Sequence, residues 1–162
     1  MSAKTLKAHE DEITNIVSQT LRDTFKTYFD IDIGKFQNKD NEDNIADGVV
    51  CKTVFKNGTA SGAVFVSFEK PFLQIVSGMI YPPEAANTQE SFHSCAAEIA
   101  NIVSNRVKTY LNDQGYSLKM GIPSIEESAD EDDEDINISF SVREKKLFVD
   151  IIFKEHPTKA AV

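Results

Sequence analysis

The stretch that decides the fold is Ser94–Asn112, SCAAEIANIVSNRVKTYLN, which contains neither Gly nor Pro and predicts one long helix. With about 100° of rotation per residue, five of its polar residues fall within roughly 80° of Glu98: Ser94, Asn101, Asn105, Lys108 and Asn112. Apolar residues, among them Ile99, Val103 and Val107, fall on the opposite side. The stretch therefore predicts a helix with one buried face and one narrow polar stripe.

The centre of this stripe holds a carboxylate, Glu98, and a carboxamide, Asn101. They are neighbours on the helix surface because they are three residues apart. Ile102 lies only about 40° from Glu98 and places an apolar side chain beside the stripe. One interpretation of the pair is an ordinary face in contact with water. The apolar neighbour favours the other interpretation, a surface that docks a partner.

A second amphipathic helix is predicted over Leu6–Tyr28, and its sequence resembles that of the first. EITNIVS at 12–18 aligns with EIANIVS at 98–104, so that Glu12 and Asn15 match Glu98 and Asn101. Chance similarity between two amphipathic helices is the alternative. A tandem duplication with approximate two-fold symmetry explains more of the pattern.

The remaining segments predict strands and one short helix. The β-rich runs Val49–Phe55 and Ala60–Phe68 flank Asn57-Gly58, a hairpin signal because both residues tolerate positive φ. Residues 136–142 and 147–153 alternate apolar and polar side chains, which predicts a second hairpin around Glu144-Lys145-Lys146. Shorter predicted elements are a strand at 31–36, a helix at 71–80 and a strand at 117–122.

These elements predict a single α+β domain over residues 1–162. We expect a two-layer architecture, in which an antiparallel β-sheet packs its helices on one face and the two halves form a pseudo-two-fold internal repeat. No apolar run approaches the length of a membrane span, so we expect no membrane association. The two cysteines, Cys51 and Cys95, are far apart, which favours a cytoplasmic protein with reduced thiols.

The net charge of −9 comes mainly from one segment. Residues 126–135 contain eight acidic side chains, and without them about −1 remains for the rest of the chain. We expect a solvated acidic loop; a loop that selects partners or attracts cations is the alternative. Because the chain has no basic stripe, we expect no nucleic-acid binding.

Conventional catalytic motifs are poorly represented. Glu90 and His93 have the spacing of a helical metal-binding pair, but the sequence offers no second pair to complete a site. A Gly-rich phosphate loop is missing, and neither cysteine has an obvious His partner. We therefore expect no metal and no cofactor bound by this chain.

A longer pattern, Ser94-x3-Glu98-x2-Asn101-x21-Pro123, resembles the signature of the CheC/CheX/FliY family of chemotaxis phosphatases, and most closely its CheX-like members. The element order and the run GAVFVSF at 62–68 before a helix are also similar to that family. Its members usually have Gly where this chain has Ala100. That position lies on the predicted buried side, so the difference should alter packing rather than chemistry.

The resemblance implies a phosphatase that hydrolyses the aspartyl phosphate of a response-regulator receiver domain, such as CheY. Asn101 would position the attacking water, since a carboxamide both donates and accepts hydrogen bonds and does not titrate. Glu98 would pair with a lysine of the receiver, and Ile102 and Ala97 would permit close approach. The required Mg²⁺ would be held by the receiver's own acidic residues.

Several alternatives stay open at this point. Glu12 and Asn15 could form a second active site, although Phe36 stands where a Pro is expected, and we favour a relic of duplication. The resemblance implies a homodimer, which an exposed sheet edge would permit. The chain could instead be a non-catalytic adaptor that docks a receiver or a flagellar switch component through the same helix. A purely structural dimerisation domain is a third interpretation.

Overall fold

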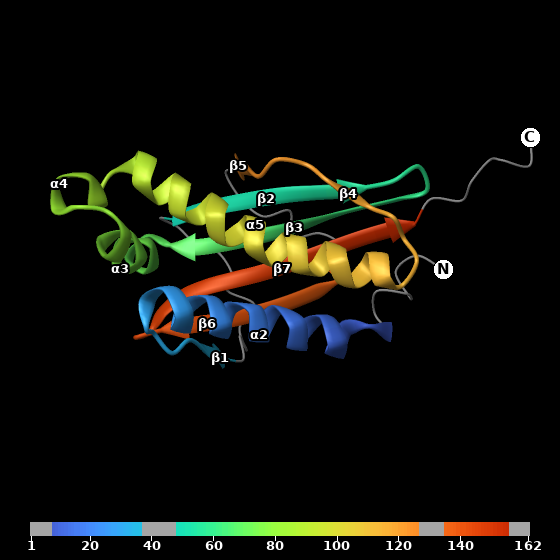
Figure 1. Cartoon of the computed structure of the whole chain (residues 1–162), viewed down its shortest axis with the longest axis horizontal. Helices are drawn as coiled ribbons and strands as arrows, with labels where there is room; N and C mark the ends of the chain where they lie inside the picture. Colours follow the sequence, from blue (N-terminus) through green and yellow to red (C-terminus); the bar gives the residue numbers. More distant parts are fainter. Residues whose placement is uncertain (1–7, 37–47, 127–134, 156–162) are drawn as a thin grey trace, which may run out of the picture.

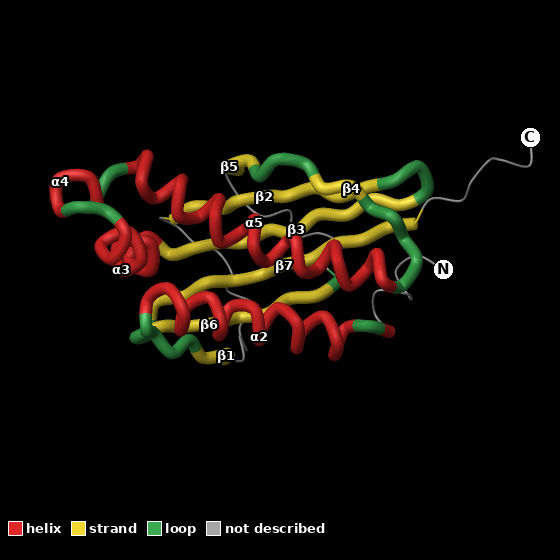
Figure 2. The backbone as a smooth tube through the Cα atoms, viewed as in Figure 1, coloured by secondary structure: helices red, strands yellow, loops and turns green. Residues whose placement is uncertain are grey.

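The computed structural model describes residues 8–36, 48–126 and 135–155 (Figures 1 and 2). Its helices are α2 (Glu10–Phe29), α3 (Lys70–Ile80), α4 (Pro83–Ala86) and α5 (Gln89–Asp113). Its strands are β1 (Gly34–Phe36), β2 (Gly48–Lys56), β3 (Ala60–Glu69), β4 (Lys119–Met120), β5 (Ser124–Glu126), β6 (Ile136–Val142) and β7 (Lys145–Glu155).

The strands form one antiparallel sheet in the order β1-β6-β7-β3-β2-β4, and β5 also pairs with β2. Its centre is the β3–β7 pair, in which residues 60–68 face residues 147–155. Helices α2 and α5 lie side by side over one face of this sheet and run in opposite directions (Figure 1). The predicted two-layer α+β architecture, with helices on one face, is confirmed.

The core lies between this helical layer and the sheet. Fully buried apolar side chains reach it from α2 (Leu21, Phe25), from α5 (Val103) and from the sheet (Phe55, Phe153). Leu21, Val103 and Phe153 lie on faces that the hydrophobic periodicity predicted to be buried. Burial of this apolar surface is the main force that holds the helices on the sheet.

The β2–β3 hairpin forms where it was predicted, but the predicted reason is wrong. Neither Asn57 nor Gly58 adopts a positive φ. The Asn57 side-chain oxygen instead accepts hydrogen bonds from the backbone N–H groups of Thr59 and Ala60, both at 2.7 Å. Its side-chain amide also donates to the Tyr116 carbonyl. These side-chain bonds close the loop together with one backbone bond, from the Asn57 N–H to the Ala60 carbonyl at 2.9 Å.

The β6–β7 hairpin turns one to two residues earlier than predicted. Arg143 and Glu144 form the turn, with φ values of 50° and 69°, and β7 begins at Lys145. A two-residue loop with positive φ at both positions matches the twist of the flanking strands, although neither residue type favours it. This strained pair carried no recognisable turn signal in the sequence.

Replacing this turn by Asn-Gly is expected to stabilise the protein. In the double variant Arg143→Asn, Glu144→Gly, both residues tolerate the left-handed conformation, so the free energy of unfolding should rise by about 1 kcal/mol. Urea denaturation monitored by circular dichroism measures the change. An unchanged or lower midpoint would contradict the assignment of strain to this turn.

The predicted internal repeat stays a prediction, but the strand order is compatible with it. Exchange of β1 with β4, β6 with β2 and β7 with β3 leaves the order of the sheet unchanged. The short strand β5 was not predicted. Of the acidic loop, residues 127–134 lie outside the described residues.

Candidate functional site

Helix α5 is fixed at both ends by side-chain hydrogen bonds. At its start, the Thr88 hydroxyl oxygen accepts from the Ser91 N–H at 3.1 Å, and the Ser91 hydroxyl accepts from the Thr88 N–H at 3.2 Å. At its end, the Asn112 side chain bonds both the N–H and the carbonyl of Leu118. The pair at the start is a capping box, which satisfies helix-end N–H groups that would otherwise lack partners. The Asn112 bonds tie the end of the helix to the segment before β4. The helix is therefore a well-anchored platform.

The pair Glu98 and Asn101 lies midway along this platform, on the face turned away from the sheet. Glu98 is exposed and Asn101 is half-buried, whereas Ala100 beside them is fully buried. In residues 8–36, 48–126 and 135–155, no hydrogen bond or ion pair engages either side chain. Both polar groups are thus available to another molecule. The neighbours Ala97 and Ile102 are half-buried, so no bulky side chain from these two positions stands out beside the pair.

The matching pair on α2 has a different environment. The Tyr110 hydroxyl donates to Glu12 Oε2 at 2.7 Å, across 98 residues of sequence. Because that hydroxyl has one hydrogen, His9 Nδ1, 2.6 Å away, must donate to the phenol oxygen. The Glu12 carboxylate is therefore engaged within the chain, and only Asn15 is left as an exposed group. This contact distinguishes the α2 pair from the pair on α5.

The Tyr110 contact predicts a loss of stability in alkali. Burial, and then the hydrogen bond and charge of Glu12, raise the pKa of Tyr110 to about 12. The folded state thus holds this proton more tightly than the unfolded state, so the stabilisation is present below pH 10 and is lost as the pH approaches 12. Between these values the wild type should lose about 1–2 kcal/mol more than Tyr110→Phe.

Denaturant titrations of the two proteins at several pH values measure this difference. Tyr110→Phe should already be less stable by about 1 kcal/mol near pH 8, because its partners lose a hydrogen bond. Other groups titrate in both proteins and cancel in the comparison. Parallel stability profiles up to pH 12 would show that Tyr110 does not carry the shift.

An apolar hollow of about 260 Å³ opens beside Glu98, where α2, α3 and α5 meet. Glu98 is the only charged side chain among the residues that line it. The other lining residues are Thr24, Tyr28, Phe29, Val76, Met79, Ile80, Cys95, Ile99 and Ile102. Of these residues, only Ile102 was predicted to lie beside the carboxylate. The hollow itself was not predicted, because its walls come from three separate helices.

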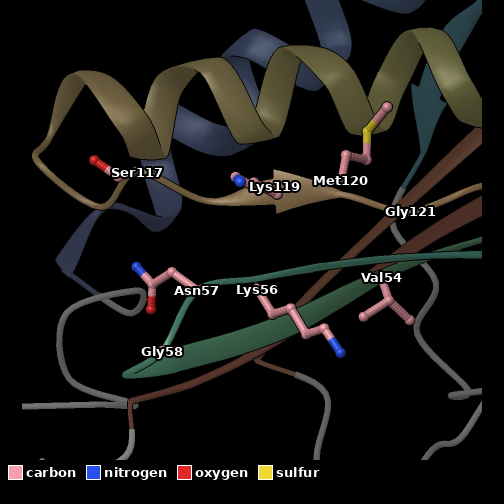
Figure 3. Close-up of a pocket in the computed structure, with 8 residues that line it drawn as sticks. All are labelled: Val54, Lys56, Asn57, Gly58, Ser117, Lys119, Met120 and Gly121. Carbon is pink, nitrogen blue, oxygen red and sulfur yellow. The ribbon is translucent and has the colours of Figure 1, made fainter.

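A larger hollow lies elsewhere. It is an open groove of about 760 Å³ between the end of the β2–β3 hairpin and residues 117–121 (Figure 3). Lys56 and Lys119, which are direct cross-strand partners, both line it. It contains neither Glu98 nor Asn101, and size alone therefore does not mark the predicted site.

The two cysteines are buried and free. Burial, with a smaller contribution from the Glu126 charge, raises the pKa of Cys51 to about 11, and burial also raises the pKa of Cys95. Both thiols are therefore protonated near neutral pH, consistent with packing roles. The described residues hold no cluster of three metal-ligating side chains.

Together, the fold and the site define a class of protein: a two-layer α+β domain that presents an unpaired carboxylate and carboxamide on one anchored helix. The sequence profile described as chemotaxis phosphatase CheX matches residues 49–150. The chain belongs to this CheX family. No curated protein sequence matches it significantly. Among the described residues, no helix is long and apolar enough to cross a membrane.

Several solved structures share this fold. The chemotaxis protein CheX from Vibrio vulnificus has a TM-score of 0.66 at 21% identity, over 88% of this chain and 99% of that one. A chemotaxis protein from Desulfovibrio vulgaris has a TM-score of 0.67 at 15% sequence identity, over 88% of this chain and 97% of that one. The Borrelia burgdorferi CheX-CheY complex with BeF3 and Mg has a TM-score of 0.64 at 17% sequence identity, over 90% of this chain and 98% of that one. At these identities the likeness shows the shared fold.

Proposed function

We propose that this chain hydrolyses the aspartyl phosphate of a CheY-like receiver domain through Glu98 and Asn101 of α5. The observation that carries the proposal is the pair itself, since both side chains lie on one outward face without an intramolecular partner in the described structure. Membership of the CheX family supports the reaction class. The Borrelia burgdorferi complex supports the partner class, because a similar fold is there bound to CheY.

The proposed chemistry requires little from this chain. An acyl phosphate is already reactive, so a water placed in line with phosphorus is enough to lower the barrier substantially. The water oxygen attacks phosphorus, the bond from phosphorus to the aspartate oxygen breaks, and the carboxylate and inorganic phosphate leave. Asn101 accepts a hydrogen bond from the water through its side-chain oxygen, and it keeps this capacity at every pH because it does not titrate.

In this proposal, Glu98 orients helix α5 on the receiver. Its carboxylate pairs with a lysine of the receiver, and a charge-assisted contact fixes the position of α5 against the partner. The cap at Thr88 and the bonds from Asn112 to Leu118 keep that position constant. Mg²⁺ belongs to the receiver, where it neutralises charge on the phosphoryl oxygens. This chain supplies no ligand to it.

A phosphate-release assay tests the proposal. Receiver domains from the same organism are phosphorylated with a small-molecule donor, and the decay of each phosphoprotein is followed with and without this chain. We expect accelerated decay for at least one receiver. Binding without acceleration would instead support an adaptor, and unchanged decay together with absent binding would refute the proposed function.

A further inference from the structure

The hollow beside Glu98 is surrounded by an unusual concentration of exposed apolar surface. Tyr28 is 71% exposed, Met79 47% and Ile80 52%, and all three line it. The other exposed large apolar side chains of the described residues, Val54, Ile122 and Ile125, belong to β2 and the segment from β4 to β5. Clustered apolar side chains on a surface generally mark an interaction site.

The hollow and the polar pair share one boundary. From Glu98, helical geometry places Asn101 about 60° to one side, and Ile102, Cys95 and Ile99 between about 40° and 100° to the other. The latter three line the hollow, while Asn101 does not. A partner that meets Asn101 and pairs with Glu98 would therefore also cover the mouth of the hollow.

Its size and charge restrict what fits there. A volume of about 260 Å³ lies below the roughly 300–1,000 Å³ of small-molecule sites and suits a single large side chain. Since Glu98 is the sole charged lining group, the complementary partner surface carries a cation immediately next to an apolar residue. This requirement concerns the partner's surface, whereas water positioning by Asn101 concerns the phosphorylated site.

The hollow is also formed before any partner arrives. The Ser77 hydroxyl of α3 donates to the Ala86 carbonyl of α4, and its oxygen lies 3.1 Å from the Ser91 hydroxyl oxygen of α5. These bonds hold α3, which carries Met79 and Ile80, against α5, which carries Glu98. Figure 1 shows α3 at the end of the helical layer, next to both long helices. A preformed receptor loses little conformational freedom on binding.

We propose that this hollow receives an apolar side chain of the phosphorylated receiver, adjacent in the receiver surface to the lysine that pairs with Glu98. The inference rests on the proposed function. It adds a feature that determines which receivers are bound, namely an apolar residue beside the lysine on the receiver surface. Receivers with a polar or acidic residue in that place would be bound poorly.

The test compares matched variants in binding and in turnover. The double variant Met79→Gln, Ile80→Asn makes the rim polar at similar volume, Met79→Leu, Ile80→Leu keeps it apolar, and Ile122→Asn changes an exposed apolar residue elsewhere. Each protein is titrated with receiver domains of the same organism loaded with beryllofluoride and Mg²⁺. The polar variant should raise Kd at least tenfold, which corresponds to about 1.4 kcal/mol. The two controls should stay within twofold of wild type.

The outcomes separate this inference from the proposed function. If the polar variant binds like wild type while wild type hydrolyses the phosphoprotein, the hollow is not the receptor and the function stands. If wild type binds without hydrolysis and the polar variant loses affinity, the proposed function fails. The assignment of the hollow as the receptor for an apolar side chain of the receiver then still holds. If wild type binds none of the receivers, both are overturned. A polar variant that changes only self-association would show that the hollow pairs two copies of this chain.

Discussion

Replacement of Asn101 by Ala is expected to slow the decay of the phosphorylated receiver about 100-fold relative to wild type. This is the scale of loss when a reacting group is no longer held in line. The side chain makes no hydrogen bond within the described structure, so its removal leaves no unsatisfied partner in this chain. Ala also favours helix more than Asn does, and α5 should remain intact. The effect should therefore fall on turnover rather than on folding or binding.

The chain provides a matched control for this experiment. Asn15 follows Glu12 at the same spacing, but Tyr110 engages that carboxylate. Asn15→Ala should therefore leave turnover unchanged, and phosphate release from single-turnover reactions compares the two variants directly. Loss of about half the activity in Asn15→Ala would show two working sites. A fully active Asn101→Ala protein would remove this residue from the mechanism.

Replacement of Gly62 by Ala should destabilise the protein by about 3 kcal/mol. Gly62 lies on β3 in the centre of the sheet, and an added Cβ would approach the Ile152 carbonyl oxygen to 2.6 Å. It would also lie 2.7 Å from Phe55 Cε2 and 2.8 Å from Phe153 Cδ1, both on fully buried rings. Neither the β7 backbone nor the packed rings can move without loss of pairing or packing.

The matched control is Gly78→Ala on α3. A Cβ there meets nothing within 4 Å, and Ala is the better helix former, so this variant should gain about 0.5–1 kcal/mol. Urea denaturation of the three proteins gives both changes with opposite signs. A Gly62→Ala protein as stable as wild type would mean that the β3–β7 contact is looser than the described structure.

Periodicity explains why the main elements could be predicted from the sequence. The phase of α5 follows from apolar residues such as Val103 and Val107, and the β6–β7 hairpin follows from alternating side chains. The β2–β3 hairpin follows from two β-rich runs that flank Asn57-Gly58. Turn geometry was harder. Arg143 and Glu144 adopt left-handed conformations that their residue types do not favour, and Asn57 closes its turn by a side-chain bond.

Features that depend on distant residues could not be predicted. The engagement of Glu12 by Tyr110 spans 98 positions, and nothing near either residue indicates it. Strand β5 has three residues and forms only by pairing with β2. The hollow beside Glu98 needs side chains from α2, α3 and α5 at once. Periodicity reports which face of an element is buried, but not what it meets.

The pairing of β3 with β7 has a consequence for how the chain folds. This central ladder joins residues 60–68 to residues 147–155, and β6 in turn carries β1 from the start of the chain. Contacts so distant in sequence require long loops to close first, which slows folding. Until β7 pairs with it, β3 therefore keeps one unpaired strand edge, even though α5 can already pack on the β2–β3 hairpin and on α2. Aggregation during synthesis is the corresponding hazard, and chaperone dependence of yield is where it would be seen.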